Sequence, residues 1–116
     1  NIEVIFIGGR VNKDSQITVG GGPIGVLSEL RVDICFLGVN SMHPTDGITE
    51  FDWEIVQLKK AMIRASKKVV VSSISEKISS VQRYKICDID SVDILITELE
   101  NTDPKLEAYR GKIELM

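Results

Sequence analysis

The sequence predicts an α/β fold in which a mostly parallel sheet is covered by helices. The segments Val4–Gly9 and Val32–Gly38 are continuous apolar runs, which is typical of strands buried on both faces of a sheet. Helical patterns follow such strands along the chain, and this alternation favours a parallel sheet. The 116 residues suffice for about one domain, so we expect residues 1–116 to form a single domain.

The first part of the chain predicts two long strands, with a short β-like piece and a helix between them. Val4–Gly9 ends in two glycines, and a short β-like piece, Ile17–Val19, precedes three more. Pro23–Leu30 places its larger apolar residues on one helical face, and its proline suits the first turn, where a missing N–H costs nothing. Val32–Gly38 is then the second strand.

The clearest predicted helix follows Asp52, which is a suitable N-cap. An apolar stripe runs along this helix through Trp53, Ile55, Val56, Leu58, Ala61, Met62 and Ala65. Two further strands are expected at Val69–Ser73 and Val92–Thr97. Asp103 can cap a last helix that Gly111 ends, and a short strand completes the chain at residues 112–115.

The composition excludes several classes of protein. The net charge of −3 gives no sign that this chain grips nucleic acid by itself. No run approaches the roughly 18 apolar residues of a membrane span, so no membrane association is expected. The two cysteines, Cys35 and Cys87, match no metal pattern and are expected to be reduced core thiols of a cytoplasmic protein. We expect no metal and no cofactor.

The most hydrogen-bond-rich stretch of the chain follows its second strand. Parallel sheets place ligands at the carboxyl ends of their strands, so this stretch is a candidate binding loop. Its polar side chains are Asn40, Ser41, His43, Thr45, Asp46 and Thr49. The lone His43 is expected to be a surface or loop-bracing residue rather than a catalyst. Capping alone would explain Thr49 and Asp52.

Glycines and one lysine are further candidates for binding an anion. Gly8 and Gly9, and the run Gly20–Gly22, precede elements as phosphate-cradling loops do, although turn formation is the favoured explanation. Lys77 follows the third long strand and could reach over the same sheet edge toward a phosphate. A solvated lysine in a serine-rich loop is the simpler alternative. No order of residues suggests a catalytic nucleophile.

The succession of motifs resembles the C-terminal effector-sensing domain of the DeoR family of bacterial transcriptional repressors. The resemblance rests on "VDICFLG", "DGIT", "LKKAMI", "KKVVV" and "DIDSVDILIT", in this order, and covers essentially the whole chain. It implies a fold similar to ribose-5-phosphate isomerase and glucosamine-6-phosphate deaminase, which is CoA-transferase-like. It also implies a homo-oligomer that binds a phosphorylated sugar or related metabolite without turning it over, and so loosens operator DNA from an N-terminal winged helix-turn-helix.

The resemblance assigns ligand-binding positions by motif. These positions are Gly8, Gly9, Gly38, Asn40, Gly47, Thr49 and Lys77. Of these, Gly38, Asn40 and Lys77 are expected nearest the ligand. The family's helix also carries an acid and a lysine, which Glu54 and Lys59 match. A simpler explanation is that Glu54 stabilises the positive end of the helix dipole and that Lys59 is a solvated cation.

The chain departs from the family pattern at three positions. Ser41 stands where glycine is usual, Ile74 replaces an aspartate of the lysine loop, and Glu98 replaces an aspartate after "Ile-Thr". The change at Ile74 removes a hydrogen-bond acceptor from the expected sugar side of the site. The chain also opens within an expected strand, without Met, and lacks the family's first glycine-threonine loop. We therefore expect a fragment that represents the later part of the sensing domain.

Three functions remain open from the sequence. The first is a non-catalytic sensor segment of a repressor of sugar metabolism. The second is an oligomerisation module with a degenerate ligand site, which Ser41 and Ile74 favour. The third is a sugar-phosphate isomerase or deaminase-like enzyme, for which His43 and Asp46 are the only convenient general bases.

Overall fold

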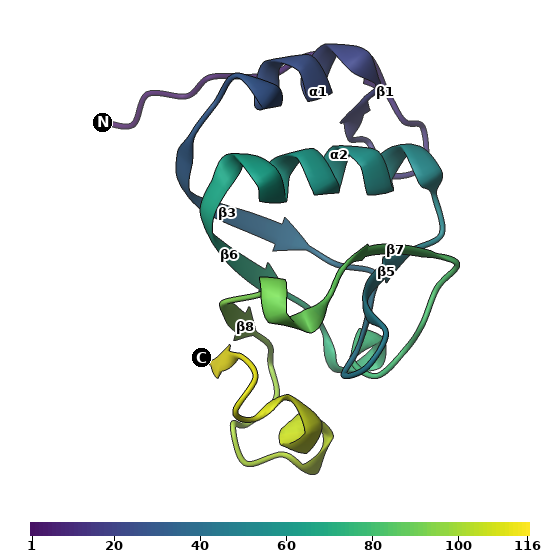
Figure 1. Cartoon of the computed structure of the whole chain (residues 1–116), viewed down its shortest axis with the longest axis vertical. Coiled ribbons are helices and arrows are strands. Elements are labelled where there is room, and N and C mark those ends of the chain that lie inside the picture. Colours follow the sequence, from purple (N-terminus) through teal and green to yellow (C-terminus); the bar gives the residue numbers. More distant parts are fainter.

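The computed structural model describes residues 1–116 and shows an α/β fold built on a four-stranded sheet, all of whose strand pairs are parallel (Figure 1). The strand order is β3-β6-β8-β9, with registers such as Phe36 opposite Val70 and Val70 opposite Ile94. The strands span Val32–Gly38 (β3), Ser66–Ser72 (β6), Ile94–Ile96 (β8) and Glu114–Leu115 (β9). The predicted parallel α/β class is confirmed, and β3 has the predicted bounds.

Helix α2 (Trp53–Ala65) lies between this sheet and helix α1 (Gly21–Ser28) (Figure 1). Asp52 is its N-cap, as predicted, because the Asp52 carboxylate accepts hydrogen bonds from the N–H groups of Glu54 (2.9 Å) and Ile55 (3.3 Å). Most of the predicted apolar stripe is buried, but Trp53 is 57% exposed. Its ring instead packs edge-on against Tyr84, with centroids 5.2 Å apart.

The segment after β3, expected to be a loop, instead contains two strands of a second, antiparallel sheet. It consists of β4 (Ser41–His43), β5 (Gly47–Glu50) and β7 (Tyr84–Cys87). In the turn between β4 and β5, His43 Nδ1 accepts hydrogen bonds from the N–H groups of Thr45 (3.1 Å) and Asp46 (3.2 Å). The prediction that His43 braces its loop is confirmed.

The prediction of a strand at Val4–Gly9 is wrong. This segment has no strand neighbour, and Phe6 is 84% exposed. A strand buried on both faces needs partners on both edges and packing on both faces, and nothing in the described chain supplies them here. The expectation that Val32–Gly38 is buried on both faces is also wrong. β3 is an edge strand that pairs only with β6. Cys35 and Leu37 are buried, whereas Phe36 on the opposite face is 70% exposed.

The remaining elements are short. A small hairpin pairs β1 (Arg10–Val11) with β2 (Thr18–Val19). Three 3₁₀ helices follow: η1 (Ser75–Lys77), η2 (Ile89–Ser91) and η3 (Pro104–Tyr109). The last predicted helix is therefore a 3₁₀ helix, and Asp103 caps it through the N–H of Lys105 at 2.8 Å.

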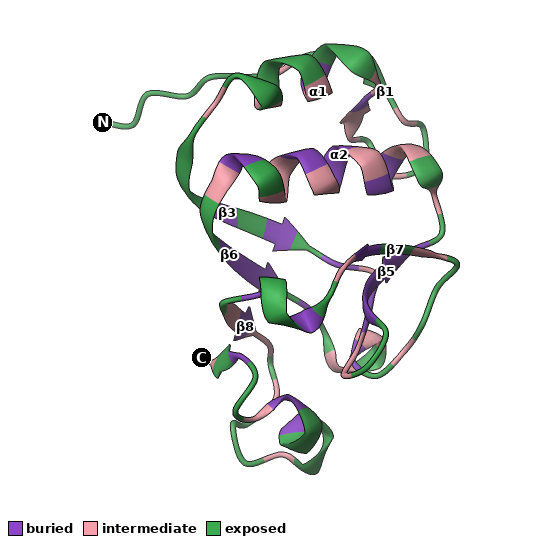
Figure 2. Ribbon diagram, viewed as in Figure 1, coloured by how far each residue is buried: buried purple, intermediate pink, exposed green.

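A single large apolar core lies between the main sheet, α2, the second sheet and η3 (Figure 2). Val71, Leu95 and Tyr109 are among its fully buried side chains. Both cysteines are free thiols, Cys35 buried in the core and Cys87 partly buried. Burial raises the pKa of both thiols, that of Cys87 to about 11, which disfavours the reactive thiolate. None of the helices has both the length and the apolar character needed to cross a membrane.

Candidate ligand-binding site

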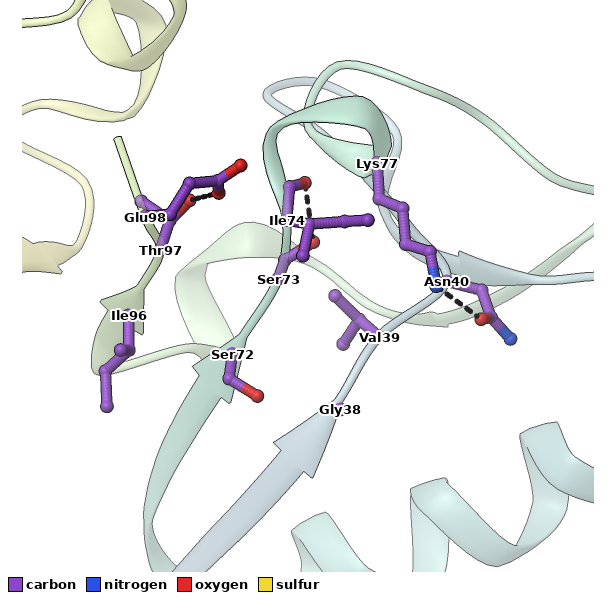
Figure 3. Close-up of a pocket in the computed structure, with 10 residues that line it drawn as sticks. All are labelled: Gly38, Val39, Asn40, Ser72, Ser73, Ile74, Lys77, Ile96, Thr97 and Glu98. Atoms are coloured by element: carbon purple, nitrogen blue, oxygen red, sulfur yellow. Dashed lines mark hydrogen bonds between the residues drawn. The ribbon is translucent and has the colours of Figure 1, made fainter. Parts of the chain in front are cut away.

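A cavity of about 440 Å³ opens at the carboxyl ends of β3, β6 and β8 (Figure 3). Three parallel strands end at this edge, which is where open α/β sheets hold their ligands. The polar groups of the cavity come from Gly38, Asn40, Ser72, Ser73, Lys77, Thr97 and Glu98. Val39, Ile74 and Ile96 give it apolar walls, so the site combines a few polar groups with an apolar surface, as small-molecule sites do.

Lys77 is the only lysine or arginine that lines the cavity. It stands at the end of η1, where its N–H donates to the carbonyl of Ile74 at 3.0 Å. Its ammonium donates to Asn40 Oδ1 at 3.3 Å, so the two side chains point toward each other across the rim (Figure 3). This contact joins the loop after β6 to the end of β3.

A buried ion pair stands behind Asn40. The Glu50 side chain is fully buried and that of Lys59 is 9% exposed, with Lys59 Nζ 3.5 Å from Glu50 Oε1. Glu50 also accepts hydrogen bonds from Asn40 Nδ2 (2.7 Å) and from the N–H of Phe51 (2.9 Å). Lys59 donates to the Gly38 carbonyl at 2.8 Å. A continuous chain of polar contacts thus runs from Gly38 through this pair to Asn40 and Lys77.

Burial lowers the pKa of Lys59, and the neighbouring Glu50 carboxylate opposes this effect. The pair fixes the Asn40 amide, since the NH₂ group is held by Glu50 and the oxygen faces Lys77. The positive charge of Lys59 is matched by Glu50, so Lys77 supplies the uncompensated positive charge of this wall.

Glu98 is an exposed residue that lines the cavity from the β8 side, and Ser73 and Ile74 lie between it and Lys77 (Figure 3). The N–H of Ser75 donates to both carboxylate oxygens, at 3.0 and 3.2 Å, and the Thr97 hydroxyl donates to Oε1 at 2.9 Å. The hydrogen bond from Ser75 is the largest cause that lowers the pKa of Glu98, so this carboxylate is ionised at neutral pH.

The structure brings together three of the sequence-predicted site residues, because Gly38, Asn40 and Lys77 all line the cavity. Gly47 and Thr49 lie instead in β5, within the second sheet. Gly47 has φ 81°, and a Cβ there would lie 2.1 Å from the Cys87 carbonyl oxygen, so packing against β7 requires glycine.

Thr49 and Ser41 are buried partners of each other. Their hydroxyls are 2.9 Å apart, and Thr49 Oγ1 also accepts from the N–H of Gln82 at 2.8 Å. Serine at the position where the family has glycine is therefore accommodated by a hydrogen bond inside the second sheet, rather than by the cavity.

Gly8 and Gly9 lie in the N-terminal segment, away from the cavity-lining residues. A Cβ on Gly9 would come within 2.7 Å of Pro23 Cδ, so this glycine permits close packing against α1. Ligand contacts by Gly8, Gly9, Gly47 and Thr49 stay predictions.

The helical pair Glu54 and Lys59 is divided between two roles. Glu54 forms an ion pair with Arg10 near the helix start. The alternative that Lys59 is a solvated cation is wrong, because Lys59 is buried against Glu50.

Sequence reasoning missed several residues of the site. Ser72 is the last residue of β6, Ser73 follows it and Thr97 follows β8, and these positions at the ends of apolar strands could have identified all three. The burial of Glu50 could not be recognised from the sequence, because its side-chain partners lie ten residues before it and nine residues after it along the chain. Ile74 lines the cavity and presents an apolar surface where the family has a carboxylate.

Comparison with known proteins matches residues 1–99 to the family described as the DeoR C-terminal sensor domain. This range includes every residue that lines the cavity. The match confirms the predicted resemblance, together with the predicted similarity to sugar-phosphate isomerase and deaminase folds. It also agrees with the prediction of a sensor rather than an enzyme.

Curated relatives are named as transcriptional regulators. The HTH-type transcriptional repressor GlcR of Bacillus subtilis is 30% identical over 97 residues, which cover 84% of this chain and 37% of that protein. The HTH-type transcriptional regulator GolR of Listeria innocua is 26% identical, and the glycerol-3-phosphate regulon repressor of Escherichia coli is 24% identical, each over 84% of this chain and 39% of the relative. The chain thus spans about two fifths of the length of these relatives.

Proposed function

Since the chain belongs to the family of DeoR C-terminal sensor domains, we propose that it binds a phosphorylated sugar or related metabolite and controls DNA binding by an N-terminal winged helix-turn-helix. The observation that carries this proposal is the cavity in which Gly38, Asn40 and Lys77 meet at the ends of parallel strands. The names of relatives, among them a glycerol-3-phosphate regulon repressor, support a phosphorylated effector and a site of action on operator DNA in the cytoplasm.

Lys77 is suited to hold the phosphoryl group. Its ammonium is a point charge with three donors, of which the structure shows one used on Asn40. The hydroxyls of Ser72 and Ser73 lie along the same cavity and can bind phosphate or sugar oxygens. The buried Lys59–Glu50 pair keeps this arrangement in place through Asn40 and the Gly38 carbonyl.

The proposed control is a shift between two arrangements of the sensor. A ligand that engages Lys77 competes with Asn40, and Asn40 is linked through Glu50 and Lys59 to helix α2. Helix α2 packs against α1, so a change at the cavity can be passed through α2 to α1, the layer of the domain farthest from the sheet. The ligand acts by binding one arrangement more tightly than the other.

Titrating the protein, joined to its DNA-binding region, with a panel of sugar phosphates tests this proposal. A ligand at 100 times its dissociation constant is expected to stabilise the sensor by about 2.7 kcal/mol and to release operator DNA. Melting temperature and operator binding are measured on the same samples. Turnover of the sugar phosphate would instead indicate an isomerase or deaminase, and no response across the panel would indicate an oligomerisation module with a degenerate site.

We further propose that the protein is a homo-oligomer assembled through the free edge and open face of β3. This strand pairs only with β6, and its exposed apolar residues are Val32, Ile34 and Phe36. Sedimentation is expected to show a dimer that Phe36→Lys weakens, whereas Val26→Lys, at an exposed position on α1, leaves it intact. A monomer at high concentration contradicts this proposal.

A further inference from the structure

A second hollow of the surface lies at the end of the main sheet opposite the ligand cavity. It consists of two adjoining cavities of about 400 and 300 Å³, and Arg31, Arg64 and Ala65 line both. The C-terminal ends of α1 and α2 meet the first residues of β3 and β6 at this place (Figure 1). We call these two cavities together the helix-end groove. It shares no residue with the cavity that Lys77 lines.

The two halves of the helix-end groove differ in chemistry. The half between α1 and α2 has mainly apolar walls, supplied by Ile24, Leu27 and Ala61. The half beside the strand starts is polar, and its charged residues besides the two shared arginines are Lys67 and Asp33. Three cations and one acid thus line the polar half. The shared arginines join this positively charged half to the apolar half.

The two arginines have donors that no other part of the chain uses. Neither takes part in an ion pair, and their only side-chain hydrogen bond runs from Arg31 Nη1 to the carbonyl of Leu30 at 2.8 Å. Arg64 lies in the last turn of α2, where its charge suits the negative end of the helix dipole. Asp33 does not neutralise either arginine, since it forms no ion pair. A guanidinium has five N–H donors, so both arginines can still bind an anion.

Part of the negative charge at this end of α2 is already balanced. The carbonyl oxygens of a helix C-terminus carry partial negative charge and would repel an anion. Here the Ser66 hydroxyl donates to the Met62 carbonyl at 2.6 Å, and the Ser66 N–H donates to the Ile63 carbonyl. Two of these carbonyls are thus satisfied within the chain, so the cationic side chains determine the charge of the groove.

We propose that the helix-end groove is a second ligand site, which binds an organic anion with an apolar or aromatic body. The phosphate or carboxylate group of this ligand lies against Arg31 and Arg64, and its body lies between α1 and α2. Arginine binds such groups through paired hydrogen bonds and also stacks on aromatic rings. The volume of the groove is in the range of about 300–1,000 Å³ that is typical of small-molecule sites. This ligand is distinct from the proposed sugar phosphate, whose body is polar.

Calorimetric titration of the full chain with phenyl phosphate, inorganic phosphate and phenol tests this inference. The first probe carries both parts of the proposed ligand, the second only its anionic group and the third only its aromatic body. The proteins are the wild type, Arg64→Gln, Arg83→Gln and Lys77→Met. Arg83 is an exposed arginine that lines neither site and forms no ion pair, so Arg83→Gln controls for the loss of a guanidinium. Matching circular dichroism spectra verify that each variant is folded.

The wild type is expected to bind phenyl phosphate at least about tenfold more tightly than inorganic phosphate or phenol, because only phenyl phosphate engages both halves of the groove. Arg64→Gln is expected to weaken phenyl phosphate binding about tenfold, whereas Arg83→Gln and Lys77→Met change it by less than about twofold.

Three results would overturn the inference. The first is that the wild type does not bind phenyl phosphate, or binds inorganic phosphate equally tightly. The second is an equal loss of affinity in Arg64→Gln and Arg83→Gln. The third is a loss in Lys77→Met but not in Arg64→Gln, which would place the probe in the other cavity. None of these results contradicts the proposed function, which the panel of sugar phosphates tests separately.

Discussion

Replacing Lys59 with methionine is expected to lower the free energy of unfolding by about 3–5 kcal/mol. Methionine fills a similar volume but leaves the fully buried Glu50 carboxylate without its cation. It also removes the donor to the Gly38 carbonyl. A buried charge without a partner costs far more than a surface charge, because neither water nor an opposite charge solvates it. Urea denaturation at neutral pH measures the loss.

Lys60→Met is the matched control, because Lys60 is the next residue of the same helix and makes no hydrogen bond or ion pair with another side chain. Its effect is expected within about 0.5 kcal/mol. Combining Lys59→Met with Glu50→Gln is expected to recover part of the stability, since glutamine carries no charge and its single amide oxygen can still accept from Asn40. The hydrogen bond from the N–H of Phe51, which goes to the other oxygen of Glu50, is lost. A Lys59→Met variant as stable as Lys60→Met would show that the buried pair is not formed.

Replacing Lys77 with methionine is expected to weaken binding of a sugar phosphate about 10- to 100-fold, which corresponds to the loss of one charge-assisted hydrogen bond. Lys77 is the only cation that lines the cavity, so no neighbouring side chain can replace it. Stability is expected to change little, because Lys77 is half-buried and forms no ion pair. Isothermal titration with the best ligand of the panel measures the affinity.

Lys67→Met controls for the general loss of positive charge. Lys67 is exposed near the start of β6, at the end of the strand opposite the cavity, and the same change there is expected to leave affinity within about twofold. If both variants weaken binding equally, the effect is one of net charge. If neither does, Lys77 does not hold the phosphoryl group.

The elements that the sequence predicts well are those whose signals are local. Strand β3 is a mainly apolar run that ends in Gly38, and α2 begins at Asp52, whose carboxylate accepts hydrogen bonds from the N–H groups of Glu54 and Ile55. The edge of the sheet that carries the site also follows from the sequence, because parallel strands share the direction of their carboxyl ends. This placed Gly38, Asn40 and Lys77 together correctly.

Elements that depend on distant partners could not be predicted. The second sheet buries Ser41 and Thr49, whose polarity reads as a loop until their mutual hydrogen bond is known. Glu50 is buried for the same reason, since its cation comes from α2 and its other donor from Asn40. The N-terminal apolar segment has strand-like composition, but without a neighbouring strand its backbone has nothing with which to pair.

A crystal structure of the protein with its tightest-binding sugar phosphate tests the central claim most directly. The account predicts that the phosphoryl group lies within hydrogen-bond distance of Lys77 Nζ, and that the sugar lies in the cavity at the ends of β3, β6 and β8. A sugar phosphate bound at any other surface, or seated in the cavity with its phosphoryl group away from Lys77, would contradict the account.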